Sequence, residues 1–173
     1  IIPEGSLLNP TPPSSVSGCT TETMQRLVGV VMGALGQAIP ERVPACPFGT
    51  GTNIGLGGRS PTMGHYATIF FWGGGYGGYF GGDGLTNGST VISASRNSSV
   101  EVLEQTVPLL FTRYSVRENS AGDGQYRGGF GVEVSFQLRD GDGYLTLLGD
   151  RGVVAPYGLC GGNPGLPADH DFH

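Results

Sequence analysis

The residues best suited to chemistry in this chain are acidic and basic side chains that stand beside glycine. The most unusual stretch, residues 72–84, interleaves glycines with aromatic residues and includes Asp83. Glycine lets backbone N–H groups face an anion or lets a substrate approach the main chain, and it also permits a tightly packed loop. This glycine loop is therefore either a structural or interface loop, or a loop that lines a substrate or subunit contact. No helix is expected after it, so its value as a dinucleotide fingerprint is weak.

Other aspartates also stand next to glycine or arginine. Asp123 precedes Gly124, and Asp150 is followed by Arg151 after an apolar run. Most such aspartates shape turns. Asp150 and Arg151 are expected to form a structural ion-pair network with Arg127 or Glu133. A role in acid–base catalysis would require a partner carboxylate or histidine close by.

The positions of the histidines and cysteines in the sequence predict no metal site. His65 precedes an apolar run and is interpreted as a hydrogen-bonded structural residue rather than a base. His170 and His173 belong to a short acidic tail, where a flexible terminus more often binds no metal. The cysteines are far apart and form no CxxC pair, which favours free thiols in a reducing compartment: Cys19, Cys46 and Cys160.

Charge excludes several classes of function. The chain has 14 acidic and 9 basic residues and a net charge of −5, and every basic residue is arginine. A groove for nucleic acid and a polybasic membrane patch are therefore not expected. The absence of lysine removes a P-loop lysine and a Schiff-base lysine. The longest apolar run, residues 27–38, is shorter than the ~20 residues that span a bilayer, so no membrane partner is predicted.

The first residues of the chain resemble neither an initiator methionine nor a signal peptide. The chain opens on Ile1 rather than Met, without a charged start followed by an apolar stretch. We therefore expect a cytoplasmic protein that is a C-terminal portion of a longer polypeptide, either cut from it or encoded apart. Residues 1–18, rich in proline and serine, are expected to form an extended lead-in arm.

One helix is expected after this arm. Apolar residues recur at three- and four-residue steps over residues 21–39 and predict a single amphipathic helix that ends at Pro40. The members of this stripe are Met24, Leu27, Val28, Val31, Leu35 and Ala38. Gly29, Gly33 and Gly36 each weaken a helix, so they indicate close backbone approach to a neighbouring element.

Strand and turn patterns follow, and the glycines between them show no fixed period. The expected strands lie near residues 52–57, 66–72, 90–95, 100–103, 106–117, 131–138 and 143–148. The dipeptides at 123–124 and 142–143 favour positive φ, and residues 139–143 between two apolar runs predict a β-hairpin. The predicted class is α+β: mainly an antiparallel sheet or sandwich over residues 19–168, with one helix, glycine-rich loops and an acidic histidine tail at 169–173.

Several stretches, in order along the chain, resemble the C-terminal part of the hydantoinase B/oxoprolinase family. This family includes the B-type subunits or domains of N-methylhydantoinases, 5-oxoprolinases and ATP-dependent ketone carboxylases. The stretches are 4–10 (EGSLLNP), 22–28 (ETMQRLV), 34–40 (ALGQAIP), the glycine loop at 73–84, 96–104 (RNSSVEVLE), 122–131 (GDGQYRGGFG), 147–151 (LLGDR) and 157–162 (YGLCGG).

The resemblance implies an assembly with several parts. A hydantoinase A-like partner carries ATP in an actin-like fold, and the pair opens a cyclic amide or carboxylates a ketone through a phosphorylated intermediate. ATP and a divalent metal are expected elsewhere in that complex and not in this segment, which alone should be inactive. The expected partners are this A-type protein, the rest of the B-type polypeptide and a small-molecule substrate.

The leading hypothesis is the C-terminal part of the B-type subunit of an ATP-dependent hydrolase of cyclic amides, of the hydantoin or 5-oxoproline type. One alternative is a component of an ATP-dependent ketone carboxylase of the acetone or acetophenone type. Another is a non-catalytic assembly module, since no convincing nucleophile, base or metal cluster is evident. No catalytic residue is assigned. The candidates for substrate or interface contact are Gly74, Gly75, Tyr76, Gly77, Asp83, Arg96, Asn97, Asp150 and Arg151.

Overall fold

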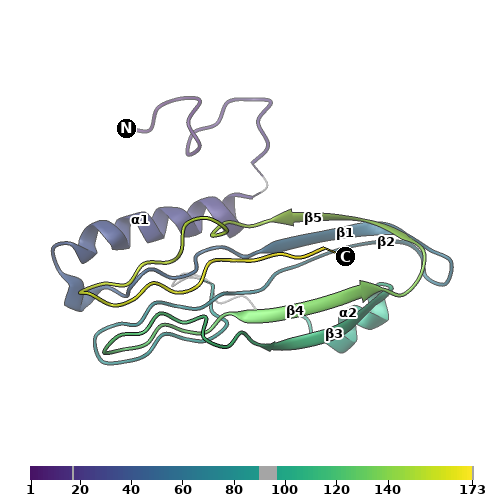
Figure 1. The fold of residues 1–173 in the computed structure, drawn as a ribbon. Helices are drawn as coiled ribbons and strands as arrows, with labels where there is room; N and C mark the ends of the chain where they lie inside the picture. Colours follow the sequence, from purple (N-terminus) through teal and green to yellow (C-terminus); the bar gives the residue numbers. More distant parts are fainter. Residues whose placement is uncertain (17, 90–96, 173) are drawn as a thin grey trace.

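Two antiparallel sheets form one end of the molecule, and glycine-rich segments without regular strands form the other (Figure 1). The structure is a computed structural model that describes residues 1–16, 18–89 and 97–172. Its elements in chain order are η1 (Cys19–Thr23), α1 (Met24–Gly36), η2 (Pro40–Arg42), β1 (Asn53–Ser60), β2 (Gly64–Phe70), α2 (Val100–Thr106), β3 (Leu109–Val116), β4 (Val132–Leu138) and β5 (Asp142–Leu148). The predicted α+β class is confirmed.

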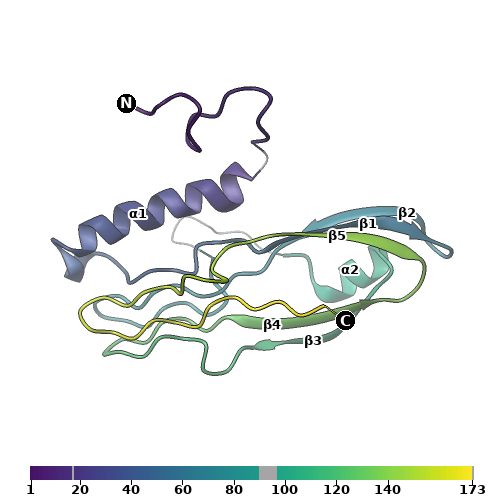
Figure 2. The same ribbon diagram turned by 45° about the horizontal axis from the view of Figure 1, so that its top comes forward.

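The two sheets face each other and enclose the apolar core (Figure 2). One sheet has the order β2-β1-β5 and the other pairs β3 with β4, all antiparallel. Buried side chains from both sheets and from α2 fill the space between them: Ile54, Leu56, Tyr66, Phe70, Trp72, Leu103, Val107 and Leu109. The rings of Phe70 and Trp72 meet edge to face at 4.9 Å between centroids, which is a favoured aromatic geometry. This end of the molecule, defined as the sheet half, is held by side-chain packing.

A tight turn joins β1 to β2. The Ser60 hydroxyl accepts hydrogen bonds from the backbone N–H groups of Thr62 and Met63, and Gly64 adopts φ +79 at the start of β2. Ser60 then pairs with Gly64 across the hairpin. The turn thus uses a serine side chain and a left-handed glycine, both common in short connections.

One of the strands expected in the sheet half is a helix. The stretch at 100–103, predicted as a strand, is the start of α2, because Ser99 caps the helix and the buried Leu103 and Val107 lie four residues apart. There are therefore two α-helices among the described residues. The predicted strand at 90–95 lies outside the described residues.

Residues 139–143 do not close a hairpin, because β4 pairs with β3 while β5 pairs with β1. The connection carries the chain from one sheet to the other. Its positive φ, +76, is at Gly141, which packs against the Arg59 carbonyl, whereas positions 142 and 143 are already in β5. Neither position of the 123–124 dipeptide has positive φ either, so both dipeptide predictions are wrong.

The other end of the molecule, defined as the glycine half, consists of extended segments that hydrogen-bond to one another at three-residue intervals. Ala45 and Phe48 donate to Gly78 and Gly75, at 2.8 and 2.9 Å. The same spacing recurs between three other pairs of segments. The backbone N–H groups of residues 76 and 79 donate to the carbonyls of residues 85 and 82, those of 84 and 87 donate to 127 and 130, and those of 163 and 166 donate to 123 and 120. An antiparallel β ladder would repeat every second residue, whereas a polyproline II backbone has three residues per turn. These contacts therefore indicate threefold segments of polyproline II type.

Glycine allows these segments to touch backbone to backbone. A Cβ added at Gly77 would overlap the carbonyl of Ala45, and one added at Gly75 would overlap Gly129. Gly75 and Gly78 lie three residues apart on one such segment, whereas Gly81, with φ +100, lies in the turn where the chain reverses between Tyr79 and Gly82.

The N-terminal helix lies along the glycine half (Figure 1). It begins as a π-turn at Cys19 and continues as α1 to Gly36, ending before the predicted residue 39. Close approach is confirmed at Gly33 and Gly36, which pack against Tyr157 and Leu159, while nothing lies within 4 Å of a Cβ at Gly29.

The predicted apolar stripe of the helix points away from the protein. Such a stripe ordinarily faces the core. Here Met24, Leu27, Val31 and Leu35 are exposed, whereas Gln25 is buried. Within the described residues, no helix is long and apolar enough to cross a membrane.

Candidate functional site

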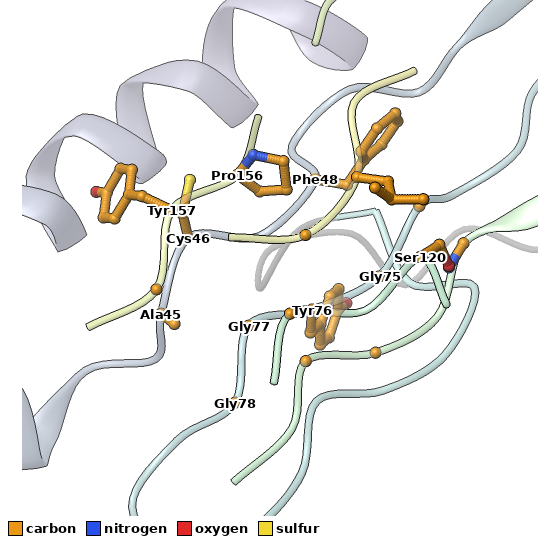
Figure 3. Close-up of a pocket in the computed structure, with 18 of the residues that line it drawn as sticks. Ala45, Cys46, Phe48, Gly75, Tyr76, Gly77, Gly78, Ser120, Pro156 and Tyr157 are labelled. Carbon is orange, nitrogen blue, oxygen red and sulfur yellow. The ribbon is translucent and has the colours of Figure 1, made fainter. Parts of the chain in front are cut away.

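The glycine half encloses a cavity of about 800 Å3 (Figure 3). The segment from Ala45 to Phe48 and the glycine loop around Tyr76 lie side by side and form part of its lining. Ser120, Pro156 and Tyr157 complete the part drawn in the figure. The three-residue hydrogen-bond pattern holds the lining segments together, and the lining combines glycine backbone with aromatic side chains such as Phe48, Trp72 and Tyr76.

Tyr76 and Tyr157 are two of the polar side chains in this lining. Burial raises the pKa of Tyr76, so its phenol keeps its proton at neutral pH. Burial also raises the pKa of Tyr157, with a further contribution from Cys46 and an opposing one from Arg151. Both side chains therefore act as neutral hydroxyl groups that can donate and accept hydrogen bonds.

Arg151 holds the Cys46–Phe48 wall from behind. Its Nε donates to the Phe48 carbonyl at 3.0 Å, and its Nη2 contacts the Pro47 carbonyl at 3.3 Å and the Cys46 sulfur at 2.8 Å. Its Nη1 reaches the carbonyls of Val154 and Ala155. One guanidinium thus ties the wall to the chain that leads to Tyr157. Arg151 itself has φ +71, an uncommon conformation for a non-glycine residue.

Arg26 of α1 contacts the same carbonyl from another direction. Its Nη1 donates to the Phe48 carbonyl at 3.3 Å, and its Nε lies 3.0 Å from Asp150 Oδ2. Burial, followed by the nearby charge of Arg151, lowers the pKa of Arg26, which nevertheless stays charged at physiological pH. The two arginines therefore share one backbone oxygen and fix its position.

Glu22 extends this network toward β1. Its Oε1 accepts hydrogen bonds from the Gly51 N–H at 3.2 Å and from Asn53 Nδ2 at 3.0 Å. Burial raises the pKa of Glu22 above its ordinary value, although its hydrogen bonds and Arg26 act in the opposite direction. Neither Glu22 nor Arg26 was predicted to have a role, although both lie within the 22–28 stretch that carries the resemblance.

The expected ion-pair partners of Asp150 and Arg151 are wrong. Asp150 pairs with Arg26, and its Oδ1 accepts the backbone N–H of Arg151 at 2.7 Å. Arg127 pairs instead with Asp83 at 3.5 Å, and Glu133 pairs with Arg113 at 2.8 Å. These charged residues do form ion pairs, but their partners depend on contacts between distant segments.

The structure brings together only part of the candidate set. Gly74, Gly75, Tyr76 and Gly77 line the cavity, and Arg151 and Asp150 lie behind the neighbouring Cys46–Phe48 segment. Asp83 lines a second, more open hollow of about 900 Å3 and accepts the backbone N–H of Arg127. Asn97 is exposed and its side-chain amide donates to the Phe71 carbonyl. Arg96 lies outside the described residues.

The described histidines and cysteines form no metal cluster. No group of three or more His, Cys, Asp or Glu suited to a metal occurs among residues 1–16, 18–89 and 97–172. Cys46 is buried and lines the cavity, whereas Cys19 and Cys160 are exposed, and all of them are free thiols. His170 and its acidic neighbours line the mouth of the cavity, a position that the sequence pattern did not predict.

Comparison with known proteins gives a consistent family match. The profile described as Hydantoinase B/oxoprolinase covers residues 1–171. The 5-oxoprolinase PfmaA of Pestalotiopsis fici is 34% identical over 95% of this chain and 13% of its own length. A putative B-type subunit of a D-/L-hydantoinase from a Pseudomonas species is 30% identical over 95% of this chain and 27% of its own.

A solved structure shares the fold. Nucleotide-free acetone carboxylase matches with a TM-score of 0.65 and 25% identity, over 78% of this chain and 18% of that one. The chain thus spans less than a third of each of these relatives.

Proposed function

This chain belongs to the hydantoinase B/oxoprolinase family, and from that membership we propose that it is the C-terminal part of the B-type subunit of an ATP-dependent hydrolase. The reaction is the opening of a cyclic amide of the hydantoin or 5-oxoproline type, performed together with an ATP-binding A-type subunit. The observation that carries the proposal is the match, over 95% of the chain, to proteins named for these two substrate types.

Within this proposal the cavity of the glycine half binds rather than breaks bonds. Tyr76 offers a neutral hydroxyl, which suits an uncharged amide better than a phosphate, whereas the Tyr157 hydroxyl lies against Gly33 of α1. The Cys46 sulfur contacts Arg151 and the Pro47 carbonyl, and neither of these is a general base. The glycine loop then lines the substrate path or the contact with the A-type subunit.

ATP and a divalent metal belong elsewhere in the proposed complex. The chain has no lysine, and its described residues contain no group suited to a metal. The residues present thus do not fit either group, and no step is assigned here to ATP or to a metal. The chemical step is expected on the remaining parts of the assembly, which the proposal places in the cytoplasm.

The test is a substrate-dependent ATPase assay on the assembled enzyme. The complete B-type polypeptide is purified with its A-type partner and given ATP with hydantoin, with 5-oxoproline, or with neither. We expect ATP hydrolysis to rise with one cyclic amide and the ring-opened acid to accumulate in step. A complex that hydrolyses ATP equally with and without every cyclic amide would contradict the proposal.

A ketone carboxylase is the second candidate, favoured by the shared fold with acetone carboxylase. Both reactions activate an oxygen with ATP, so the same preparation separates them. ATP hydrolysis that requires bicarbonate together with a simple ketone, and yields a carboxylated product, would replace the hydrolase by the carboxylase.

An assembly module without catalytic contacts is the third candidate, favoured by the glycines that pack against the protein's own backbone. Asp83→Ala and Arg151→Ala in the complete complex address it. Unchanged kcat and KM with weakened association of the subunits would make this segment a scaffold.

A further inference from the structure

Helix α1 has polar side chains on its inward side and apolar side chains on its outward side, which is the reverse of a helix on the surface of a soluble domain. Its inward side carries Gln25, which accepts a hydrogen bond from Ser89, and Arg26, which contacts the Phe48 carbonyl. Its outward side is apolar, with Val30 69% exposed and Val31 49% exposed. The other exposed members of this side are Met24, Leu27, Ala34 and Leu35. We call this set the outer face of α1.

An uncovered face of this kind is costly in water. Exposed apolar surface is unfavourable in proportion to its area, and a helix that is apolar on its outer side is normally buried. The N-terminal arm lies on the same side of the helix in both views (Figures 1 and 2). It adds exposed Ile1, Ile2, Leu7 and Leu8. The outer face therefore has the character of a buried contact rather than of a solvent surface.

The spacing of the side chains in the outer face of α1 indicates that a second helix could pack against it. Met24, Leu27, Val31 and Ala34 follow one another at steps of three and four residues. Side chains at these steps form the ridge that packs into the grooves of a second helix. No charged residue belongs to this face, as in the core of a permanent interface. An apolar helix fits this description better than a polar or charged surface.

We propose that the outer face of α1 is covered by an apolar helix from the part of the same B-type polypeptide that lies outside this chain. The proposal rests on the proposed function, because it assumes that the chain is one part of a longer subunit. The relatives have that length: this chain matches 27% of the hydantoinase B-type subunit and 13% of the 5-oxoprolinase. In both, several times more polypeptide is present in the same chain.

A covering helix in the same chain is preferred over a separate subunit. One matched relative is named as a subunit, whereas the 5-oxoprolinase carries no subunit designation, and additional length in the same chain is common to both. A segment linked to α1 also has a high effective concentration. An apolar surface without charge would remain exposed before a separate partner arrived, which favours aggregation.

Cysteine labelling tests this assignment. Val30→Cys is introduced into a variant in which the exposed Cys19 and Cys160 are replaced by serine. This variant is prepared both as this chain and as the complete B-type polypeptide. The rate of maleimide labelling at position 30 itself is measured natively and in denaturant by mass spectrometry of the peptide that contains it, because the buried Cys46 also reacts in denaturant. In this chain alone, the two rates should agree closely. In the complete polypeptide without its partner, we expect native labelling to be at least about tenfold slower than in denaturant, at every protein concentration, because reaction then requires local opening.

Three other outcomes would each overturn the proposal. Protection that needs the A-type subunit would make that subunit the occupant. Protection that grows with protein concentration would indicate a second copy, and fast labelling throughout would mean that nothing covers the face. None of these outcomes depends on ATP hydrolysis, so an inactive complex with a protected Val30 would count against the proposed reaction alone.

A charged variant gives a second measurement that does not depend on labelling. Val30→Glu should leave the melting temperature of this chain nearly unchanged, because the side chain is exposed there. It should lower the melting temperature of the complete B-type polypeptide by several degrees, because a charge would be buried without a partner. An unchanged melting temperature in the complete polypeptide would contradict the covering helix.

Discussion

The sheet half and the glycine half of this protein are stabilised in different ways. In the sheet half, Phe70, Trp72, Phe111 and Phe136 pack ring against ring, with centroids 4.9 to 6.3 Å apart. In the glycine half, segments meet through their backbones, and added side-chain atoms would overlap neighbouring carbonyls. The first half loses stability when side chains become smaller. The second loses it when side chains become larger.

The two halves also differ in what they contribute to the core and to the cavity. The sheet half supplies most of the buried apolar side chains, whereas the glycine half supplies most of the cavity lining. Two arginines, Arg26 and Arg151, hold the cavity wall through the Phe48 carbonyl. A polar network thus performs in the glycine half the positioning that aromatic packing performs in the sheet half.

The largest expected effect comes from removing a central ring of the sheet half. Phe70 is 3% exposed, and Phe70→Ala should lower the free energy of unfolding by about 3–5 kcal/mol, since it leaves a cavity in the core. Urea denaturation of this chain measures the change. Tyr144→Ala, at a side chain 84% exposed, is the control and should change stability little. Equal losses at the two positions would contradict the side-chain core described for this half.

A smaller effect is expected from enlarging a residue of the glycine half. In Gly77→Ala the new methyl group would overlap the carbonyl of Ala45, and backbone cannot move aside as a flexible side chain can. We expect a loss of about 1–3 kcal/mol, as for overpacked sites. Gly152→Ala is the matched control, because nothing lies within 4 Å of its added Cβ. If both substitutions were tolerated equally in urea denaturation, the backbone-packed description would fail.

Sequence patterns predicted the sheet half better than the glycine half. Four expected strands correspond to β1, β2, β4 and β5, and the stretch at 106–117 contains β3, because alternation reports a half-buried strand directly. The pairing of β5 with β1 is not local, so the hairpin at 139–143 was predicted wrongly. In the glycine half, a search for periods of 2 and 3.6 residues misses segments with three residues per turn.

For the candidate site, too, the sequence predicted some of the residues and missed others. The glycine loop was recognised from composition, but Cys46 and Phe48 on the neighbouring segment carry no local signal. Arg26 could not be assigned, because its partners are 22 or more positions away in the chain.

A glycine with open space around it and a glycine in close contact with a neighbour can be compared within α1. Nothing lies within 4 Å of an added Cβ at Gly29, so Gly29→Ala should stabilise the chain by up to about 1 kcal/mol through helix propensity. At Gly33 the same methyl group would overlap the Tyr157 hydroxyl, so the gain should shrink or reverse. Thermal unfolding monitored by circular dichroism measures both. A stabilisation at Gly33 equal to that at Gly29 would show that the packing of α1 on Tyr157 is not maintained.

The smallest expected effect concerns the pH dependence of the network between α1 and β1. Burial holds the pKa of folded Glu22 above its unfolded value of about 4.5, so ionisation is more costly in the folded state. This cost is absent below the unfolded pKa, grows as pH rises toward the folded pKa, and is fully present above it. Glu22→Gln, which keeps an acceptor for the Gly51 N–H, should therefore gain stability relative to the parent chain as pH rises through this window. Urea denaturation at several pH values measures the gain, with Glu118→Gln at an exposed position as the control. A difference between variant and parent that stays constant with pH would mean that the carboxylate of Glu22 is not held at a raised pKa.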